Sequence, residues 1–266
     1  MAYFKRIFTP QYILEPIQPT FGDLALLVCC FVSGMTDAVS FDNWGVFVGM
    51  QTGNTVLLGL SAASLPRGTS YVYAKTLVSI SSFLVGAFTI FLFHRLTLPF
   101  GPKATNTSLL RLHIVFSFTA QTLVLVLAAA LCSTSLVPQD SLGGNDSILN
   151  DHRILTALPP LAFQSGMQIA TGRLLGFGEL PTIVLTSVYC DLMNDAVGLK
   201  LKNKKRDRRV GAVVLLVSGA IVAGWLLRAC IGVHGVLWIA VGLKALTSIG
   251  MWLGLRSVDV KSEGRR

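Results

Sequence analysis

The stretch SGMTDAVSFDNWGVFVGMQTGNTVLLGL, residues 33–60, decides what kind of fold this chain adopts. It is strongly apolar, yet it contains Asp37, Gln51 and Asn54. A soluble core rejects polar groups that lack partners, and a lipid-facing helix rejects them still more strongly. The stretch therefore predicts a polar face inside a bundle of membrane helices.

The composition of the whole chain also indicates a membrane protein. Of its 266 residues, 52% are hydrophobic and 13% are charged, whereas ordinary soluble domains contain roughly 25% charged residues. A helix that crosses a bilayer needs about 20 predominantly apolar residues, and the runs between the charges reach that length. We therefore expect an all-α, polytopic transmembrane helix bundle whose main partner is the lipid bilayer.

The hydropathy pattern predicts seven or eight spans, and we favour eight. The segment 154–171 is the reason for the alternative count, because it is short and contains Pro159 and Pro160. The first two segments are separated only by FDNW, which predicts a tight hairpin or a broken helix pair. The segments are 23–41, 45–65, 73–96, 109–132, 154–171, 178–199, 210–230 and 236–255.

Basic residues predict the orientation of the chain. Seven of the 22 Lys and Arg residues lie in KLKNKKRDRR, residues 200–209, between two apolar runs. No segment is long and polar enough to form a nucleic-acid-binding domain, so we expect no nucleic-acid partner. The positive-inside rule makes this loop cytoplasmic, close to anionic lipid headgroups, and predicts cytoplasmic tails at 1–22 and 256–266. The membrane domain is then 23–255.

A weak internal repeat divides the membrane domain into halves at 23–132 and 154–255. SGM occurs at 33–35 and again at 165–167, and the pair Gly-Ala occurs at 86–87 and at 219–220. Thr52 and Thr186 match at a similar offset. Four spans in each half predict parallel repeats, which are related by an axis along the membrane normal.

The opening stretch contains the strongest candidates for a site. Gly45, Gly49 and Gly53 are spaced by four, and this predicts a smooth helix ridge for close packing. Gln51, Thr52 and Asn54 either bond to another helix or line a wet path for a solute or an ion. Asp37 lies well inside the first span, where a carboxylate must be protonated, paired or facing water; otherwise it caps a broken helix.

The second half supplies a smaller polar set. Gln164 and Gln168 are four residues apart on one helix face, and Asp191 and Asp195 precede the basic cluster. We expect Asp195 to balance that cluster, whereas Asp191 lies deeper and joins the predicted polar path. Lys244 in the last span is expected to pair with a buried carboxylate.

No motif indicates catalysis, a cofactor or a metal. The chain has no nucleotide-binding Gly-rich loop, no HExxH, no GxSxG and no Cys/His cluster, so we do not expect an enzyme. The five cysteines follow apolar runs and are expected to be buried free thiols. Two glycosylation-like triplets begin at Asn106 and Asn145.

These motifs resemble the YoaK family of multi-spanning membrane proteins, also called the DUF1275 family. The resemblance rests on GMTDAVSF, on GVFVGMQTGNTVLLGL and on PLAFQSGMQIATGRL, and it extends over about 23–255. The family is functionally uncharacterised, so the resemblance implies a topology and a polar motif rather than an activity. This chain departs from the family pattern at Ile169 and Ser187.

Two functions fit these features. The first is a small-molecule transporter or permease in which Asp37 is a proton- or cation-linked carboxylate and Gln51, Asn54 and Gln168 bind along the path. The second is a membrane scaffold or accessory subunit, in which the same polar residues only hold helices together.

Overall fold

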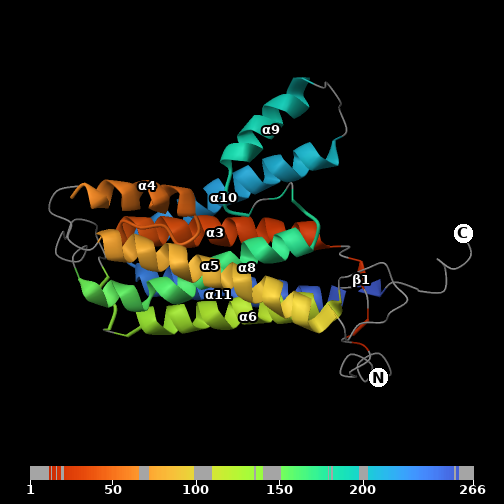
Figure 1. Cartoon of the computed structure of the whole chain (residues 1–266), viewed down its shortest axis with the longest axis horizontal. Helices are drawn as coiled ribbons and strands as arrows, with labels where there is room; N and C mark the ends of the chain where they lie inside the picture. Colours follow the sequence, from red (N-terminus) through yellow and green to blue (C-terminus); the bar gives the residue numbers. More distant parts are fainter. Residues whose placement is uncertain are drawn as a thin grey trace, which may run out of the picture.

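The computed structural model describes residues 12, 14–15, 17–18, 21–65, 72–98, 110–134, 136–139, 151–178, 180, 182–197, 203–254 and 256–257. These residues form eight α-helices, a short 3-10 helix and one pair of two-residue strands (Figure 1). The helices are α3 (Gly22–Trp44), α4 (Gln51–Ala62), α5 (Val72–Thr97), α6 (Arg111–Cys132), α8 (Leu158–Leu174), α9 (Thr186–Val197), α10 (Lys204–Arg228) and α11 (Gly232–Gly254). The 3-10 helix η2 is His152–Thr156, and β1 (Ile17–Gln18) pairs antiparallel with β2 (Arg256–Ser257). The prediction of an all-α fold is confirmed.

Five of the described helices, α3, α5, α6, α10 and α11, are long and apolar enough to cross a membrane. This finding indicates a membrane protein, as predicted. The count of eight spans is not confirmed, because α4 and α9 have 12 residues each. Such a helix is about 18 Å long, whereas the hydrocarbon core is about 30 Å thick.

The break between the first two predicted segments lies later than expected. FDNW, residues 41–44, is helical and forms the last turn of α3. The helix ends at Gly45, whose φ of 65° is left-handed and therefore suits glycine. Residues 45–50 are not helical, and α4 begins at Gln51. The predicted boundary was wrong because Asp42 and Asn43, which interrupt the apolar run, are accommodated in the last turn of α3.

Two pairs of helices pack backbone to backbone through glycines. A Cβ on Gly34 of α3 would lie 2.0 Å from the Leu216 oxygen of α10, and one on Gly219 would lie 2.0 Å from the Phe31 oxygen. The pair α5 and α8 makes the same contact: a Cβ on Gly166 would lie 2.0 Å from the Phe83 oxygen. Small residues allow this approach in membrane helices, where van der Waals packing drives association.

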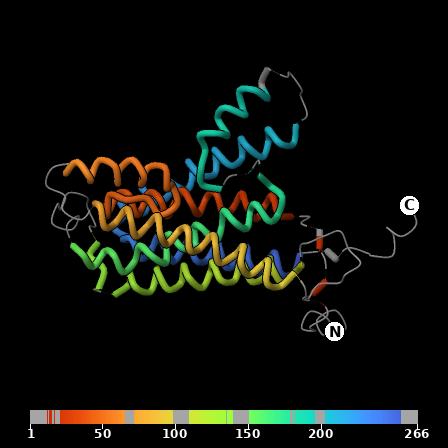
Figure 2. The backbone as a smooth tube through the Cα atoms, viewed as in Figure 1, coloured from red at the N-terminus to blue at the C-terminus, as the bar shows by residue number. Residues whose placement is uncertain are grey.

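The helix α8 runs antiparallel to α3, as Figures 1 and 2 show. Gln168 bonds to Ser33, and Gly172, further along α8, lies against Leu26, which is earlier in α3. The predicted parallel relationship between the halves is therefore not confirmed. It assumed that 45–65 and 178–199 each cross the membrane, and the short helices α4 and α9 remove that assumption.

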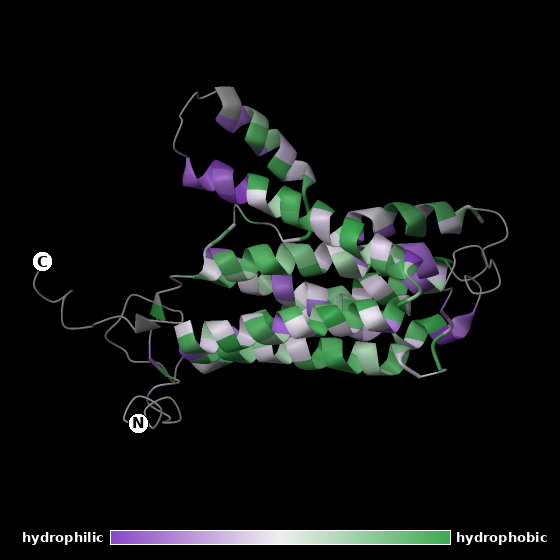
Figure 3. Ribbon diagram, turned by 180° about the vertical axis from the view of Figure 1, so that it is seen from behind, coloured by the Kyte–Doolittle hydropathy of each residue, from purple (hydrophilic) through white to green (hydrophobic). Residues whose placement is uncertain are grey.

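Hydrophobic residues predominate along the long helices (Figure 3), and many of their large apolar side chains are exposed. Phe88 of α5, Leu246 of α11 and Trp225 of α10 are each more than 60% exposed. Side chains of this kind suit contact with lipid tails. In Figure 3 the most hydrophilic segment is the start of α10, which contains the basic cluster.

Candidate functional site

The candidate site begins where the chain turns back beside α3. Asp37 Oδ1 accepts hydrogen bonds from the backbone nitrogens of Val48 at 2.9 Å and Gly49 at 2.7 Å. Ser40 Oγ donates to the carbonyl of Val46 at 2.9 Å. These side chains satisfy backbone groups that a continuous helix would have satisfied itself. Asp37 therefore holds a loop rather than the end of its own helix.

This loop lies well below the end of α3. Lys75 Nζ donates to the Trp44 carbonyl at 2.8 Å, which places the first turn of α5 beside the last turn of α3. Asp37 precedes Trp44 by seven residues, which corresponds to about 10 Å along a helix. Because Val48 and Gly49 return to the level of Asp37, α4 begins about 10 Å inside the bundle. In a membrane of ordinary thickness this position is within the hydrocarbon region.

Asn54 and Gln51 hold the other side of the loop. Asn54 Oδ1 accepts from the Phe47 nitrogen at 3.0 Å, while its Nδ2 donates to the Phe47 carbonyl at 2.7 Å and to Gln51 Oε1 at 2.8 Å. Gln51 Nε2 donates to the Val48 carbonyl at 3.0 Å. Ser79 of α5 joins them, accepting from Asn54 at 3.0 Å. The polar residues of the sequence QTGN therefore replace the missing helical hydrogen bonds.

Thr52 and the three glycines have different positions from those predicted. Thr52 is exposed. Gly45 ends α3, Gly49 lies in the loop and Gly53 lies in α4, so the predicted single helix ridge is wrong. Gly45 still lies in a turn, and Gly49 and Gly53 each have a close neighbour. A Cβ on Gly49 would lie 2.9 Å from Asp37 Oδ2.

A second polar cluster lies in the centre of the bundle around Lys244 of α11. Lys244 Nζ donates to Gln121 Oε1 and to Gln168 Oε1, both at 2.6 Å, and its side chain interacts with Cys29. Lys244 is 1% exposed. No carboxylate among the described residues pairs with it, so the predicted partner was wrong. Two amide oxygens solvate the ammonium group instead.

The amides continue this network into the neighbouring helices. Gln168 Nε2 donates to Ser33 Oγ of α3 at 2.8 Å, and Gln121 Nε2 donates to Ser117 and to Thr171, each at 3.0 Å. All of these side chains are buried. The cluster therefore joins α3, α6, α8 and α11 by hydrogen bonds at one level of the bundle.

The two clusters meet along one face of α3. Ser33 belongs to the Lys244 cluster, and Asp37 lies four residues later, which is about one turn. The buried acid of α3 therefore lies one turn from a serine that the buried base of α11 reaches through Gln168. Placing a charged residue inside a membrane protein is energetically costly, so such a residue is a candidate for a functional role.

The second half has a loop that resembles the first in position but not in its contacts. Residues 175–185 lie between α8 and α9. The repeat that aligns residues 33–35 with 165–167 places Ile169 of α8 opposite Asp37 of α3. Ile169 has no polar group to hold a loop, and in Figure 1 α9 leans away from the bundle. Ile183 of this loop packs on Gly49, with its Cγ2 2.9 Å from where a Cβ would be. The two loops are therefore in contact.

Gln164 of α8 is buried but lies outside both hydrogen-bonded clusters. Its Nε2 donates to Ser165 Oγ at 3.0 Å, and its Oε1 has no partner among the described residues. A cavity of about 340 Å³ lies next to the second loop, between the end of α8 and α9. Arg173, Thr182, Ser187 and Asp191 contribute its polar lining.

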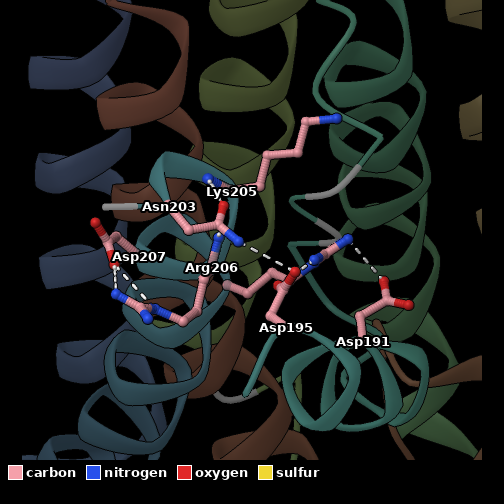
Figure 4. A network of polar contacts seen from close by, with 7 residues as sticks. Asp191, Asp195, Asn203, Lys205, Arg206 and Asp207 are labelled. Atoms are coloured by element: carbon pink, nitrogen blue, oxygen red, sulfur yellow. Dashed lines mark hydrogen bonds and ion pairs between the residues drawn. The ribbon is translucent and has the colours of Figure 1, made fainter. Parts of the chain in front are cut away.

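Asp191 belongs to an ionic cluster between α9 and the start of α10, as Figure 4 shows. Arg209 pairs with Asp191 at 3.0 Å and with Asp195, which also accepts from Asn203 at 3.2 Å. The expectation that Asp195 balances the basic cluster is confirmed. Asp191 also pairs with Arg209 of the basic cluster, and it lies apart from the two buried clusters.

Cysteines and metals add little to the site. All five cysteines are free; Cys29, Cys30 and Cys132 are buried, as predicted, but Cys190 and Cys230 are exposed. No group of three or more His, Cys, Asp or Glu residues that could hold a metal ion occurs in the described part of the chain. The triplets at Asn106 and Asn145, and most of both predicted tails, lie outside the described residues.

Sequence reasoning missed three contributors to the site. None of Lys75, Ser79 and Ile183 was singled out from the sequence, and Ile183 is one apolar residue among many. Lys75 is 2% exposed and begins a long apolar run, which was a usable signal. Ser79 and Ile183 matter through contacts with the loop 45–50, which no local pattern predicts.

Buried polar clusters inside a bundle of long apolar helices define this chain as a helical membrane protein. The model of the family described as "Protein of unknown function (DUF1275)" matches residues 25–250. The chain belongs to this family, as the motifs around Asp37 and Gln168 predicted. No curated protein and no solved structure matches it.

Proposed function

We propose that this chain is a multi-pass membrane permease for a small solute, with its path where the two interrupted segments meet. One observation carries the proposal: the backbone of 45–50 is not helical at membrane depth, and it contacts Ile183 of the second loop. Irregular backbone at that depth is tolerated only where protein buries it or where it lines a cavity. Transporters use such interrupted helices to build their binding sites.

We propose further that the halves are inverted repeats with three crossings each. In this arrangement α8, whose 17 residues span about 25 Å, is the sixth crossing helix beside the five longer ones. The repeat relates Gly34 to Gly166 and Gly86 to Gly219, and these four glycines form the two backbone contacts. The same repeat relates α3 to α8 and α10 to α5, so the packed pair α3 and α10 corresponds to the packed pair α8 and α5. The antiparallel course of α3 and α8 supports inversion.

An even number of crossings leaves both ends of the chain on one side of the membrane. The pairing of β1 with β2 brings the two ends of the described bundle together, as Figure 1 shows. The basic start of α10 lies toward the same end. We propose that this side is cytoplasmic, in agreement with the positive-inside rule.

Asp37 and Lys244 are the charged residues of the proposed path. Gln168 links Lys244 to Ser33, which lies one turn before Asp37 on α3, and Gln164 contributes an amide oxygen that has no partner among the described residues. Gln51 and Asn54 shape the path by holding the loop, and Thr52 lies on the exposed side of α4. Asp191 belongs to the rim of the cavity.

The alternative, a scaffold or accessory subunit, also has a specific observation in its favour. Gln51 and Asn54 use both their amide oxygen and their amide nitrogen in bonds to the loop, to each other and to Ser79. Side chains whose polar atoms are all used in this way need no solute to explain them. The two functions differ in what they predict for Asp37, because its Oδ2 is not used in this way.

A ligand screen tests the proposal. The thermal stability of the purified full chain in detergent is measured against a panel of metabolites, ions and pH values. A ligand at 100 times its dissociation constant stabilises the folded state by about 2.7 kcal/mol. The permease predicts a hit that Asp37→Asn abolishes and Asp42→Asn leaves intact, since Asp42 lies on the same helix but is exposed.

Solute flux then separates the two functions. In proteoliposomes, Asp37→Asn in a permease lowers uptake of the ligand found in the screen while the amount of folded protein stays constant. In a scaffold no ligand stabilises the chain, and Asp37→Asn acts only by lowering the thermal stability. That second pattern rejects the permease.

A further inference from the structure

The carboxylate of Asp37 is used on one side only. Its Oδ1 accepts two backbone hydrogen bonds and the backbone N–H of Met50 also interacts with the carboxylate, whereas Oδ2 has no partner at hydrogen-bond geometry among the described residues. The side chain is 6% exposed. Buried polar atoms nearly always have a partner, so an unused oxygen on a buried carboxylate indicates a missing ligand.

The space around this oxygen limits what the ligand can be. One point, where a Cβ on Gly49 would lie, is 2.9 Å from Asp37 Oδ2 and 2.9 Å from Ile183 Cγ2. The unused carboxylate oxygen and an apolar methyl group of Ile183 therefore lie against the same glycine. Metal cations such as Ca²⁺ need six or more oxygen ligands around them, and here one carboxylate meets the side chain of an isoleucine. A proton is the cation that fits.

We propose that Asp37 Oδ2 is an intramembrane proton-binding site, reached from the 340 Å³ cavity beside the second loop, and that Ile183 is the barrier between them. The proposal rests on the proposed permease function and deepens it by naming the coupling ion. In this proposal Thr182 and Val184 line the cavity, and Ile183 between them blocks the way to the carboxylate.

That segment separates the cavity from the carboxylate by a single thickness of chain. Thr182 and Val184 line the cavity, while Ile183 between them packs toward Gly49 and Asp37. Thr182 is 1% exposed, and its Oγ1 has no partner among the described residues. A hydroxyl in this position can bond to a water molecule in the cavity. Displacement of Ile183 then brings that water to the carboxylate.

The proton transfer itself is simple. A hydronium ion in the cavity gives its proton to Oδ2, an O–H bond forms, and a neutral water molecule remains. Hydrogen bonds to a charged acceptor are stronger than those to a neutral one. Protonation therefore weakens the hold of Oδ1 on Val48 and Gly49 and loosens the loop 45–50. Proton binding and loop position are coupled in this way.

Other ionisable groups near Asp37 are few among the described residues. Lys244 of α11 reaches the neighbouring turn of α3 through Gln168 and Ser33, with Cys29 beside it. Lys75 of α5 binds the carbonyl at the end of α3. The charged residues of α10 lie at its two ends: Arg208 near its start pairs with Asp23 at 3.0 Å, and Arg228 is its last residue. The Lys244 ammonium group is bound by the oxygens of Gln121 and Gln168 rather than by the Asp37 carboxylate.

Infrared difference spectroscopy of the full chain in lipid tests the proton site without any solute. The low-pH minus high-pH spectrum is expected to contain the carbonyl band of a protonated carboxylic acid. Asp37→Asn removes this band, whereas Asp42→Asn and Asp191→Asn keep it. If Asp37→Asn does not fold, Asp37→Glu is expected to shift the band. A band that survives Asp37→Asn, or that Asp37→Glu leaves unmoved, overturns the proposal.

Hydrogen–deuterium exchange of the same band tests the barrier. Ile183→Ala is expected to speed the exchange by about tenfold or more, because it removes packed carbons that must move before water enters. Val184→Ala, which changes the neighbouring residue on the cavity side, leaves the rate close to that of the wild type. Equal rates in the wild type and Ile183→Ala overturn the role of Ile183.

These outcomes are distinguishable from failure of the permease. A flat ligand screen together with an Asp37 band that titrates rejects the solute and keeps the proton site. A solute whose flux depends on Asp37, together with a band that never appears, rejects the proton site and keeps the permease.

Discussion

Lys244 donates a 2.6 Å hydrogen bond to Gln168 Oε1 across the interface between α11 and α8. A second bond of the same length reaches Gln121 Oε1 on α6. Among the described residues no carboxylate neutralises this ammonium group. The arrangement makes the centre of the bundle depend on one side chain, because two buried amides use it as their donor.

Replacing that donor should destabilise the protein. Lys244→Met keeps the length of the side chain but leaves the oxygens of Gln121 and Gln168 without it, and each unsatisfied buried acceptor costs about 1–3 kcal/mol. We expect a loss of about 2–4 kcal/mol in the free energy of unfolding in mixed micelles. The double variant Lys244→Met/Gln121→Met should lose less than the sum of the two single changes. A strictly additive result would contradict the network.

The loop 45–50 should be more sensitive to Asn54 than to its neighbours. Asn54→Asp loses the donor to Phe47, Gln51 and Ser79 and introduces a buried charge, so we expect a loss of at least about 2 kcal/mol in the free energy of unfolding. Thr52→Ala, on the exposed side of the same helix, should stay within about 0.5 kcal/mol of the wild type. Chemical unfolding of both variants in one detergent makes the comparison.

Much of the fold could be predicted from the sequence. The five long helices follow from hydropathy and end within a few residues of the predicted limits, except where basic residues lengthen α10 at its start. Charged helical turns at a membrane surface are not part of an apolar run, so hydropathy misses them. The short helices α4 and α9 were overestimated for the opposite reason: apolar loop residues next to a helix resemble more of the same helix.

The site was predictable as a set of residues but not as a geometry. Asp37 stood out because a carboxylate in an apolar run is costly. Its partners are backbone nitrogens of Val48 and Gly49, and backbone groups leave no trace in a sequence pattern. Lys244 also stood out, but it is solvated by Gln121 and Gln168, from helices far apart in the chain. Such pairings depend on packing.

Asp151 gives a pH-dependent contribution to stability outside the membrane helices. It caps η2 by accepting from the Arg153 nitrogen at 2.8 Å, and the Arg153 guanidinium lies beside it. The Arg153 side-chain hydrogen bonds, then the backbone bond, lower the pKa of Asp151 from 3.8 to about 2. A depressed pKa means that the stabilisation is complete above the ordinary value and disappears as the pH falls toward the lowered one.

We therefore expect the wild type to lose its advantage over Asp151→Ala as the pH falls through this window. The difference between their melting temperatures should be small, because the pair is exposed, and constant at neutral pH. Melting curves at a series of acidic pH values measure it. A difference that grows on acidification would contradict the assignment.

The glycine contacts give the strongest test of the inverted arrangement. Gly219→Ala places a Cβ 2.0 Å from the Phe31 oxygen, so α3 and α10 must separate, and forced overpacking costs about 1–3 kcal/mol. Gly224→Ala, five residues later on the same helix, meets nothing within 4 Å and serves as the matched control. Gly86→Ala, the counterpart in the first half, should match Gly219→Ala, because its Cβ would lie 2.1 Å from the Phe163 oxygen. If the two crossings are equivalent, Gly219→Ala and Gly86→Ala lose equal stability and Gly224→Ala loses none. A loss of stability at only one of the two glycines would mean that the halves do not share this contact.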